Sequence, residues 1–287
     1  MAIDPFLYVA FALGFVVGRF YPSKGPWPAR VVLGVVVVLL ALLGSVLAAT
    51  DPGALWAAIP VALALVALVL GFTALIAYAL RPHTRGADPR AVAAPSLWIG
   101  PTFIGALLGG FVLGRWAGPV LAGWIEPTLY VLLALVGFDL RWSTQALRRA
   151  WVPLVSAIGG ATVAATIAVV AIGLTVPIAF GTTLGFGFYS FAGPFLADRI
   201  GATAGFVAFL TNFLRENLTM VSSPYVGRAL RGEGLAALGG ATAMDTTLYF
   251  VTRYGDPDAG SLALSTGLVL TIGATLALPL VLGLAGA

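Results

Sequence analysis

The chain has 287 residues, of which 15 are basic and 11 acidic, so only 9% carry a charge while 60% are apolar. A soluble domain has about 25% charged residues, and the charges here are too few to cover a polar surface. This composition excludes an ordinary soluble enzyme, a disordered chain and a nucleic-acid-binding domain, since the arginines are also spread singly along the chain. The lack of cysteine and the single histidine, His83, exclude disulfide frameworks and zinc clusters. The composition favours an integral membrane protein.

Apolar stretches near the roughly 20 residues of a membrane helix follow one another along the whole sequence. The first begins after Asp4 and has no basic residues before it, which favours a first span over a cleaved signal peptide. Ten stretches are predicted, over residues 5–19, 31–50, 54–80, 97–114, 119–140, 153–180, 182–197, 203–227, 234–252 and 259–286.

The basic residues alternate between loops, and this alternation predicts the orientation of the chain. They gather in the first, third and fifth loops, whereas the second has none and the fourth has only Arg115. The odd loops are therefore expected in the cytoplasm. If the seventh and ninth segments each enter and leave on one side, Arg228, Arg231 and Arg253 also face the cytoplasm. The preferred fold is all-α, a polytopic integral membrane protein with about eight full transmembrane helices, two re-entrant or broken segments and both termini outside. Ten full spans are the alternative, and one transporter domain over 1–287 is expected in either case.

The composition of the seventh and ninth segments predicts broken helices. Residues 181–194 and 239–248 are dense in glycine, proline and hydroxyl side chains. Non-helical backbone at membrane depth persists only where protein or a water-filled cavity satisfies it. Tight helix packing through small residues is the alternative, and it is the expectation for the pairs Gly14 with Gly18 and Gly105 with Gly109.

An internal repeat links the two halves of the chain. Residues 40–44 (LALLG) recur as residues 133–137 (LALVG), and the same offset pairs Pro60 with Pro153. The loop charges give the two copies opposite orientations, so the repeat is inverted. Inverted repeats with broken helices near the midplane are typical of secondary transporters.

Ionisable residues inside spans are costly and predict function. Arg215 and Glu216 lie near the middle of the eighth segment, and because they point about 100° apart, each needs its own partner. Asn212, Glu216, Thr219 and Ser223 follow helical spacing and form one polar stripe. A substrate or proton site is the preferred interpretation, and a structural buried ion pair is the alternative.

Asp245 lies in the glycine-rich ninth segment among threonines. A carboxylate with hydroxyl groups can hold a cation or an ammonium group, but Asp245 could equally cap the helix that follows. Glu233, Asp256 and Asp258 are interpreted as loop charges.

Three motifs in the C-terminal half resemble a known family. Residues 185–193 (GFGFYSFAG), 212–216 (NFLRE) and 240–248 (GATAMDTTL) are similar in order and spacing to the lysine exporter LysO family of bacterial inner-membrane proteins. The resemblance implies export of L-lysine and of analogues such as thialysine, with intramembrane acids as functional residues. Asn217 and Tyr249 depart from the family pattern, which bears on the substrate more than on the architecture. The candidate substrate- or proton-binding residues are Glu216, Asp245, Asp51, Arg215, Asn212, Thr219, Tyr189, Ser190, Thr242 and Thr246.

The chemistry of lysine is consistent with this resemblance. Two acids could hold its two ammonium groups, and backbone N–H groups at a broken helix could hold its carboxylate. No cofactor or metal is expected, and a proton is the favoured coupling ion, with Na⁺ as the alternative. Competing hypotheses are a transporter for another amino acid or an organic anion, an ion channel, and an intramembrane enzyme, for which the chain offers no catalytic set. The lipid bilayer is the expected partner, and the sequence does not predict an oligomeric state.

Overall fold

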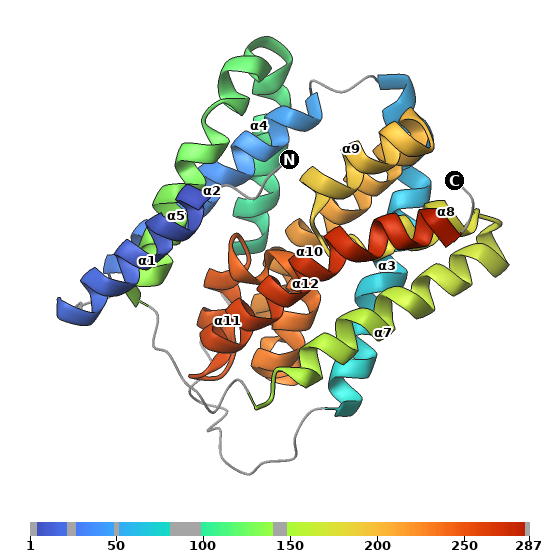
Figure 1. Cartoon of the computed structure of the whole chain (residues 1–287). Coiled ribbons are helices and arrows are strands. Elements are labelled where there is room, and N and C mark those ends of the chain that lie inside the picture. The colour runs from blue at the N-terminus through green and yellow to red at the C-terminus, as the bar shows by residue number, and fades with distance from the viewer. Residues whose placement is uncertain (1–4, 22–26, 49–51, 81–98, 140–147, 285–287) are drawn as a thin grey trace. The chain divides into compact units, whose positions relative to one another are not determined.

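The computed structural model describes residues 5–21, 27–48, 52–80, 99–139 and 148–284, and every regular element in these ranges is a helix. Contacts divide the chain into two compact units, one of residues 1–50 with 94–142 and the other of residues 51–93 with 143–287. The elements, shown in Figure 1, are α1 (Pro5–Phe20), α2 (Trp27–Ala48), α3 (Pro52–Leu80), α4 (Ile99–Ala122), α5 (Ile125–Asp139), α7 (Trp151–Ile167), η1 (Ala168–Ile172), α8 (Val176–Thr183), α9 (Tyr189–Arg199), α10 (Ala202–Gly239), η2 (Gly240–Met244), α11 (Leu248–Tyr254) and α12 (Ala259–Leu284).

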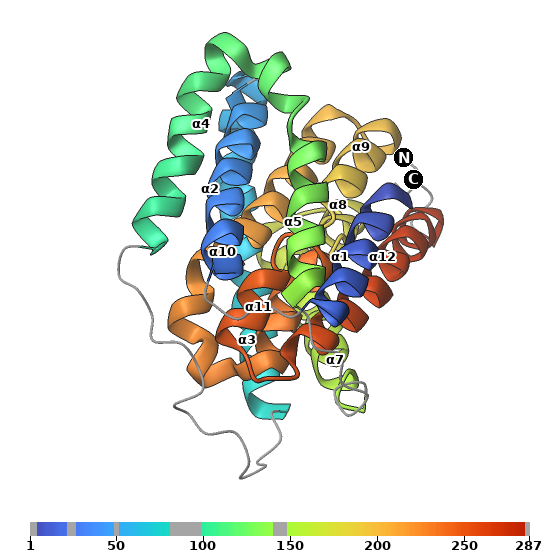
Figure 2. The ribbon, with the colours of Figure 1, turned by 90° about the vertical axis from the view of Figure 1, so that its left-hand side faces the viewer.

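The first unit is built on two close helix pairs, α1 with α5 and α2 with α4, visible in Figure 2. Gly14 and Gly18 lie against the α5 backbone at Ala134 and Phe138, which confirms the packing role expected of this glycine pair. Small residues let helix backbones approach closely in membranes. On α4 the prediction was wrong, because Gly105 and Gly109 face open space.

The glycines of α4 that do pack are Gly110 and Gly114, a pair that follows the predicted one along the same helix. They lie against the α2 backbone at Ala41 and Ser45. Sequence spacing alone could not choose between these two pairs, because both have the same i, i+4 separation and only the position of α2 decides which face is covered.

Long apolar helices frame the second unit. Among the described residues, three stretches are long and apolar enough to cross a membrane, namely Ala58–Leu80, Trp151–Ile172 and Ala259–Leu284. The apolar composition and these helices together describe an all-helical membrane protein, whose number of spans stays a prediction. The stretch Trp151–Ile172 ends in the π-helical segment η1. Gly173 then takes a left-handed conformation that ends the helix.

Beyond this turn, residues 176–199 form a helical hairpin, called here the first hairpin. Its arms are α8 and α9, and its tip is the irregular stretch 184–188. The predicted sixth segment, 153–180, was therefore too long, since its last residues belong to the first arm of this hairpin. Residues before α8 and after α9 line one cavity, so the two ends of the hairpin meet. This meeting point, residues 173–178 with 199–204, is called the first base.

Residues 232–254 form a second helical hairpin. Helix α10 breaks at Arg231, where the backbone is non-helical, so residues 232–239 are a separate arm. The tip is residues 240–247, and α11 returns beside α10 (Figure 1). Gly232 and Gly255 lie close together, since a Cβ placed on Gly255 would be 3.0 Å from the Cα of Gly232. The second base is defined as residues 231–233 with 255–258.

Candidate functional site

The tips of the two hairpins meet in the second unit. The Ala241 N–H of the second tip donates a hydrogen bond of 2.8 Å to the Phe186 carbonyl of the first tip. Gly187 (φ 98°) and Gly240 (φ 64°) have the left-handed backbone that glycine adopts without strain. A side chain on Gly240 would also collide with the Phe186 carbonyl. The glycine-rich motifs of the sequence are therefore required where the two tips touch.

Asn212 on α10 fixes the first tip. Its Oδ1 accepts a 2.7 Å hydrogen bond from the Gly187 N–H, and its Nδ2 donates to the carbonyls of Thr182 and Ala208 at 2.9 Å. The side chain is buried. A primary amide both donates and accepts, so Asn212 can bind a carbonyl at the end of α8 and an N–H of the tip at the same time.

Arg215, one turn further along α10, fixes the second hairpin. Its Nε donates to the Leu238 carbonyl at 3.0 Å, and its Nη2 donates to the Ala237 carbonyl at 2.9 Å. These carbonyls end the arm 232–239, where the helix dipole is negative and favours a cation. Nη1 is buried and has no hydrogen-bond partner among the described residues. Arg215 therefore has a structural role and still carries one free donor group.

Glu216 is completely buried, and neither of its carboxylate oxygens has a hydrogen-bond partner in the part of the chain that the structure describes. A buried charge without a partner is strongly unfavourable. Asp245 of the second tip interacts electrostatically with this carboxyl group, and the Thr246 side chain lies near it. The side chain thus lacks the partner that the alternative of a structural ion pair required, and Arg215 is engaged elsewhere.

Tyr189 brings the first hairpin to the same carboxyl groups. It begins α9, and its ring packs edge-on against Phe209 and Phe213 of α10 at centroid distances of 5.5 and 5.6 Å. Its phenol interacts electrostatically with Glu216 and Asp245. Tyr189, Glu216 and Asp245 therefore gather from three separate elements where the tips meet.

Asp245 is half-buried and accepts hydrogen bonds on Oδ1 from the N–H and the hydroxyl of Thr246. The next helix, α11, begins at Leu248 with Thr247 as its N-cap and no side-chain capping bond. Capping of α11 therefore does not explain Asp245. No group of three His, Cys, Asp or Glu side chains that could hold a metal ion is found within the described ranges.

The remaining candidate residues divide into two groups. The Thr242 hydroxyl donates to the Gly239 carbonyl within the second tip, and the Thr219 hydroxyl donates to the Arg215 carbonyl of its own helix. Thr219 and Ser223 thus satisfy α10 itself and offer no free donor. Asp51 lies outside the described residues, and Ser190 belongs to α9 but its side chain also lies outside the description.

The interpretation of Glu233 as a loop charge was wrong, because Glu233 lies in the helical arm 232–239, whereas Asp256 lies in the loop between α11 and α12 as expected. Both are buried at the second base, where Glu233 pairs with Arg149 at 2.8 Å and Asp256 pairs with Arg231 at 3.4 Å. Asp258 lies 3.6 Å from Arg149. The run Arg-Gly-Glu-Gly at 231–234 was a signal for a helix break with charges at it, but its partners lie too far away in sequence to be identified.

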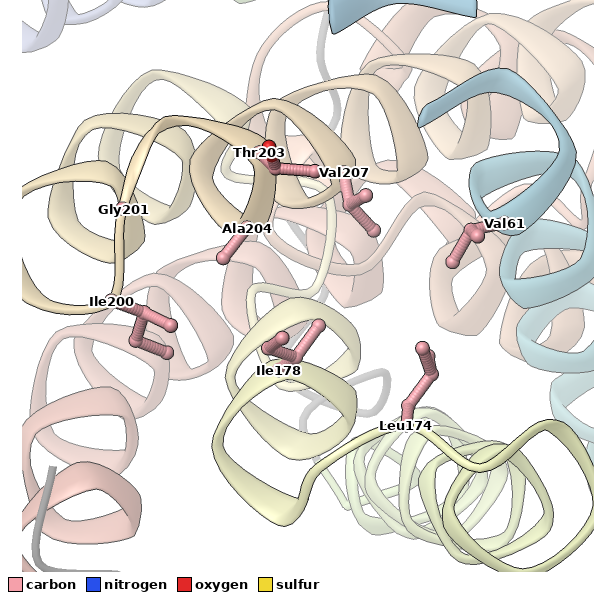
Figure 3. Close-up of a pocket in the computed structure, with 8 residues that line it drawn as sticks. All are labelled: Val61, Leu174, Ile178, Ile200, Gly201, Thr203, Ala204 and Val207. Atoms are coloured by element: carbon pink, nitrogen blue, oxygen red, sulfur yellow. The ribbon is translucent and has the colours of Figure 1, made fainter. Parts of the chain in front are cut away.

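The first base has a different character. It holds an apolar cavity of about 300 Å³ lined by Val61, Leu174, Ile178, Ile200, Gly201, Thr203, Ala204 and Val207 (Figure 3). Tyr189 is separated from Ile200 by the length of α9, about 16 Å at 1.5 Å per residue. The cavity is therefore not the carboxylate site, which is closed to solvent at Glu216.

Comparison with known proteins identifies the family. The family model described as lysine exporter LysO matches residues 99–282, more than half of the chain. The chain belongs to the lysine exporter LysO family. The matched range contains every candidate residue except Asp51.

Two curated relatives carry related names. The Escherichia coli protein "Lysine exporter LysO" is 31% identical over 153 residues, which is 51% of this chain and 51% of that protein. The Haemophilus influenzae protein "Putative lysine exporter" is 29% identical over 179 residues, or 58% of this chain and 91% of that protein. The chain thus spans about half the length of its Escherichia coli relative. No solved structure matches this LysO family member.

Proposed function

We propose that the chain is a secondary active exporter of L-lysine, and of analogues such as thialysine, in a bacterial inner membrane. Its family and the names of two relatives support this function. The observation that carries the proposal is the fully buried Glu216 carboxyl group without a hydrogen-bond partner, beside Asp245 and Tyr189 at the meeting of the tips. Such a group needs a proton or a cation.

The charges of the site are complementary to those of lysine. Glu216 and Asp245 are two acids that can hold two ammonium groups, and Arg215 offers one buried, unpartnered donor nitrogen for a carboxylate. Among tip N–H groups, those of Gly187 and Ala241 are already bonded to Asn212 and Phe186. The Arg215 Nη1 is therefore a better candidate for the substrate carboxylate than these backbone groups.

Export requires an energy source. Moving a monocation out against an inside-negative potential costs roughly 2.3 kcal/mol per 100 mV. We propose that Glu216 exchanges its bound substrate for a proton entering from outside, so that one buried site never carries an uncompensated charge. Asp245 is the second acid, and the Tyr189 phenol interacts electrostatically with both carboxyl groups.

Alternating access needs a route to each side of the membrane, and the two bases supply suitable positions. Leu174, just after the helix 151–172, lines the first base, and Arg149, just before that helix, pairs with the second. These 22 residues span about 33 Å, close to the thickness of the hydrocarbon core. The first base is proposed to face outside and the second to face the cytoplasm.

The reciprocal glycine contacts of the first unit support the proposed inverted repeat. Gly14 and Gly18 of α1 pack on Ala134 and Phe138, while Gly110 and Gly114 of α4 pack on Ala41 and Ser45. One set of contacts maps onto the other by shifts of 96 residues for the glycines and 93 for their partners, since 110 − 14 = 96 and 134 − 41 = 93. The second shift is the offset of the LALLG and LALVG motifs.

Flux of radiolabelled lysine in proteoliposomes, with pH and Na⁺ gradients imposed separately, tests this function. The proposal predicts saturable lysine movement that a pH gradient accelerates and a Na⁺ gradient does not. Arginine and an organic anion serve as competing substrates. Transport of the anion with Na⁺, or no lysine flux in a correctly folded preparation, would contradict the proposal.

A further inference from the structure

The second base is held together by ion pairs that bridge several elements. Arg149, just before α7, contacts Glu233 at 2.8 Å and Asp258 at 3.6 Å, and Arg231 contacts Asp256 at 3.4 Å. Glu233 begins the first arm of the second hairpin, while Asp256 and Asp258 follow the second arm. The ion pairs therefore join both arms of the hairpin to each other and to the start of α7.

The two central acids of this cluster are buried. The side chains of Glu233 and Asp256 are only 2% and 8% exposed, and each has one carboxylate oxygen without a partner among the described residues. Removing one partner of a buried pair leaves an uncompensated charge, which is far more costly than loss of a surface pair. The position of the base therefore depends strongly on these few contacts.

The backbone at Arg231 is strained. Its dihedral angles, φ 59° and ψ −167°, lie where residues other than glycine are rarely found. Such a conformation persists only when the surroundings hold it, and here the Arg231–Asp256 pair lies directly at the break. Hinges lie at the ends of elements, where a few residues absorb the change in φ and ψ, and Arg231 lies where α10 becomes the hairpin arm.

Both arms transmit the position of the base to the tip. The arm 232–239 leads from Glu233 to the carbonyls of Ala237 and Leu238, which Arg215 binds. The other arm, α11, leads from Asp256 back to Asp245. Each arm is short, on the order of 10 Å, and helical, so a movement at the base is carried to Asp245.

We propose that Arg149, Arg231, Glu233 and Asp256 are positioning residues, which hold Asp245 against Glu216 and release it when the second hairpin swings about Arg231. They touch neither substrate nor proton. The second hairpin is the element that opens the site of the proposed function. Of the two measurements below, only the transport assay rests on that function.

A cysteine reporter measures the hairpin directly, because the natural chain contains no cysteine. Ala243 lies in the second tip and is completely buried, so Ala243→Cys should react slowly with a maleimide in the closed state. In this background Glu233→Gln is expected to speed labelling by about fivefold or more. Arg148→Gln is the matched control, since Arg148 is the exposed neighbour of Arg149, and it should label at the parental rate. Arg149→Lys keeps the positive charge, and its labelling rate should stay close to the parental rate.

Two substitutions at the hinge separate strain from ion pairing. Arg231→Gln removes the pair and keeps the strained backbone, whereas Arg231→Gly removes the pair and relieves the strain in the closed state. Both should label faster than the parent, and Arg231→Gln should label faster than Arg231→Gly. A Gly variant that labels as fast as the Gln variant would contradict the hinge.

Transport provides the second readout. In proteoliposomes, Glu233→Gln should raise the half-saturating lysine concentration by about fivefold, with Arg149→Lys close to the parent. Size-exclusion profiles select only folded variants. If the parent moves no lysine, the proposed function fails, while the labelling rates still decide the present inference. Parental labelling rates in both folded Glu233→Gln and folded Arg231→Gln would overturn it.

Discussion

The two hairpins of the second unit meet at their tips, but α10 holds them with different chemistry. Asn212 binds the first hairpin, which offers a tip N–H and a carbonyl at the end of α8, and an amide can satisfy both. Arg215 serves the second hairpin, which offers carbonyls alone, and a guanidinium only donates. Asn212 and Arg215 of α10 therefore each match the backbone groups, donor or acceptor, that their hairpin leaves unpaired.

The bases differ more than the tips. The first base surrounds an apolar cavity, and the second is closed by buried ion pairs. Apolar contacts are non-directional and can slide, whereas a buried ion pair is either formed or broken at considerable cost. The bases of the two hairpins are therefore held by contacts that differ in their energetics of opening.

The largest expected effect concerns the side of the membrane that each base faces. Thr203→Cys at the first base and Arg148→Cys near the second base both place a thiol on an exposed residue of a chain without natural cysteines. A membrane-impermeant maleimide should label Thr203→Cys in intact cells. It should label Arg148→Cys only in inverted vesicles.

A permeant maleimide, which should label both variants in either preparation, is the control for this experiment. Labelling of both cysteines from the same side would show that the hairpins do not enter from opposite faces.

The next effect distinguishes the two side chains that hold the hairpins. Asn212→Leu should raise amide hydrogen exchange at the first tip, 184–188, and Arg215→Met should raise it in the second hairpin, 237–244. Each change should be on the order of tenfold, because buried backbone groups lose their partners. Exchange measured by mass spectrometry resolves the two segments.

In each variant, the hairpin that is not touched serves as the internal control. If either substitution accelerated amide exchange equally in both hairpins, the hairpins would open as one unit. Asn212 and Arg215 would then not hold them separately.

The smallest effect is predicted for Thr219. Its hydroxyl donates to the Arg215 carbonyl of its own helix, so its one donor hydrogen is not available to a substrate. Thr219→Val should change lysine flux by about twofold at most, since one such bond contributes about 1 kcal/mol. A much larger loss of lysine flux in the folded variant would instead place the Thr219 hydroxyl in the binding site.

Much of this site could be predicted from local sequence. Glycine-rich stretches with hydroxyl residues indicated where backbone would leave the helix, and the two tips occur there. The isolated Glu216 in an apolar helix indicated a group that needs a partner. Helical geometry predicted that Arg215 and Glu216 would not pair with each other. Arg215 binds carbonyls of the second hairpin, and the Glu216 carboxylate has no hydrogen-bond partner among the described residues.

Other features depend on contacts between distant residues. The burial of Glu233 and Asp256 was not predicted, because burial at the second base is set by tertiary packing and by arginine partners that the sequence alone does not identify. The wrong glycine pair of α4 was predicted to pack for the same reason, since only the position of α2 decides which face is covered. The apolar run from α7 into α8 concealed a helix end, because Gly173 lies in a sequence that is otherwise continuous in hydropathy.

Lysine efflux by the Glu216→Gln variant most directly tests whether this buried carboxyl group carries transport. Proteoliposomes loaded with labelled lysine under a pH gradient should show efflux at least about 100-fold slower than the parent, because the ammonium loses a buried charged partner. Glu216→Asp, which keeps the charge, should retain measurable, pH-driven efflux. Parental efflux by a folded Glu216→Gln protein would contradict the assignment of substrate and proton exchange to this residue.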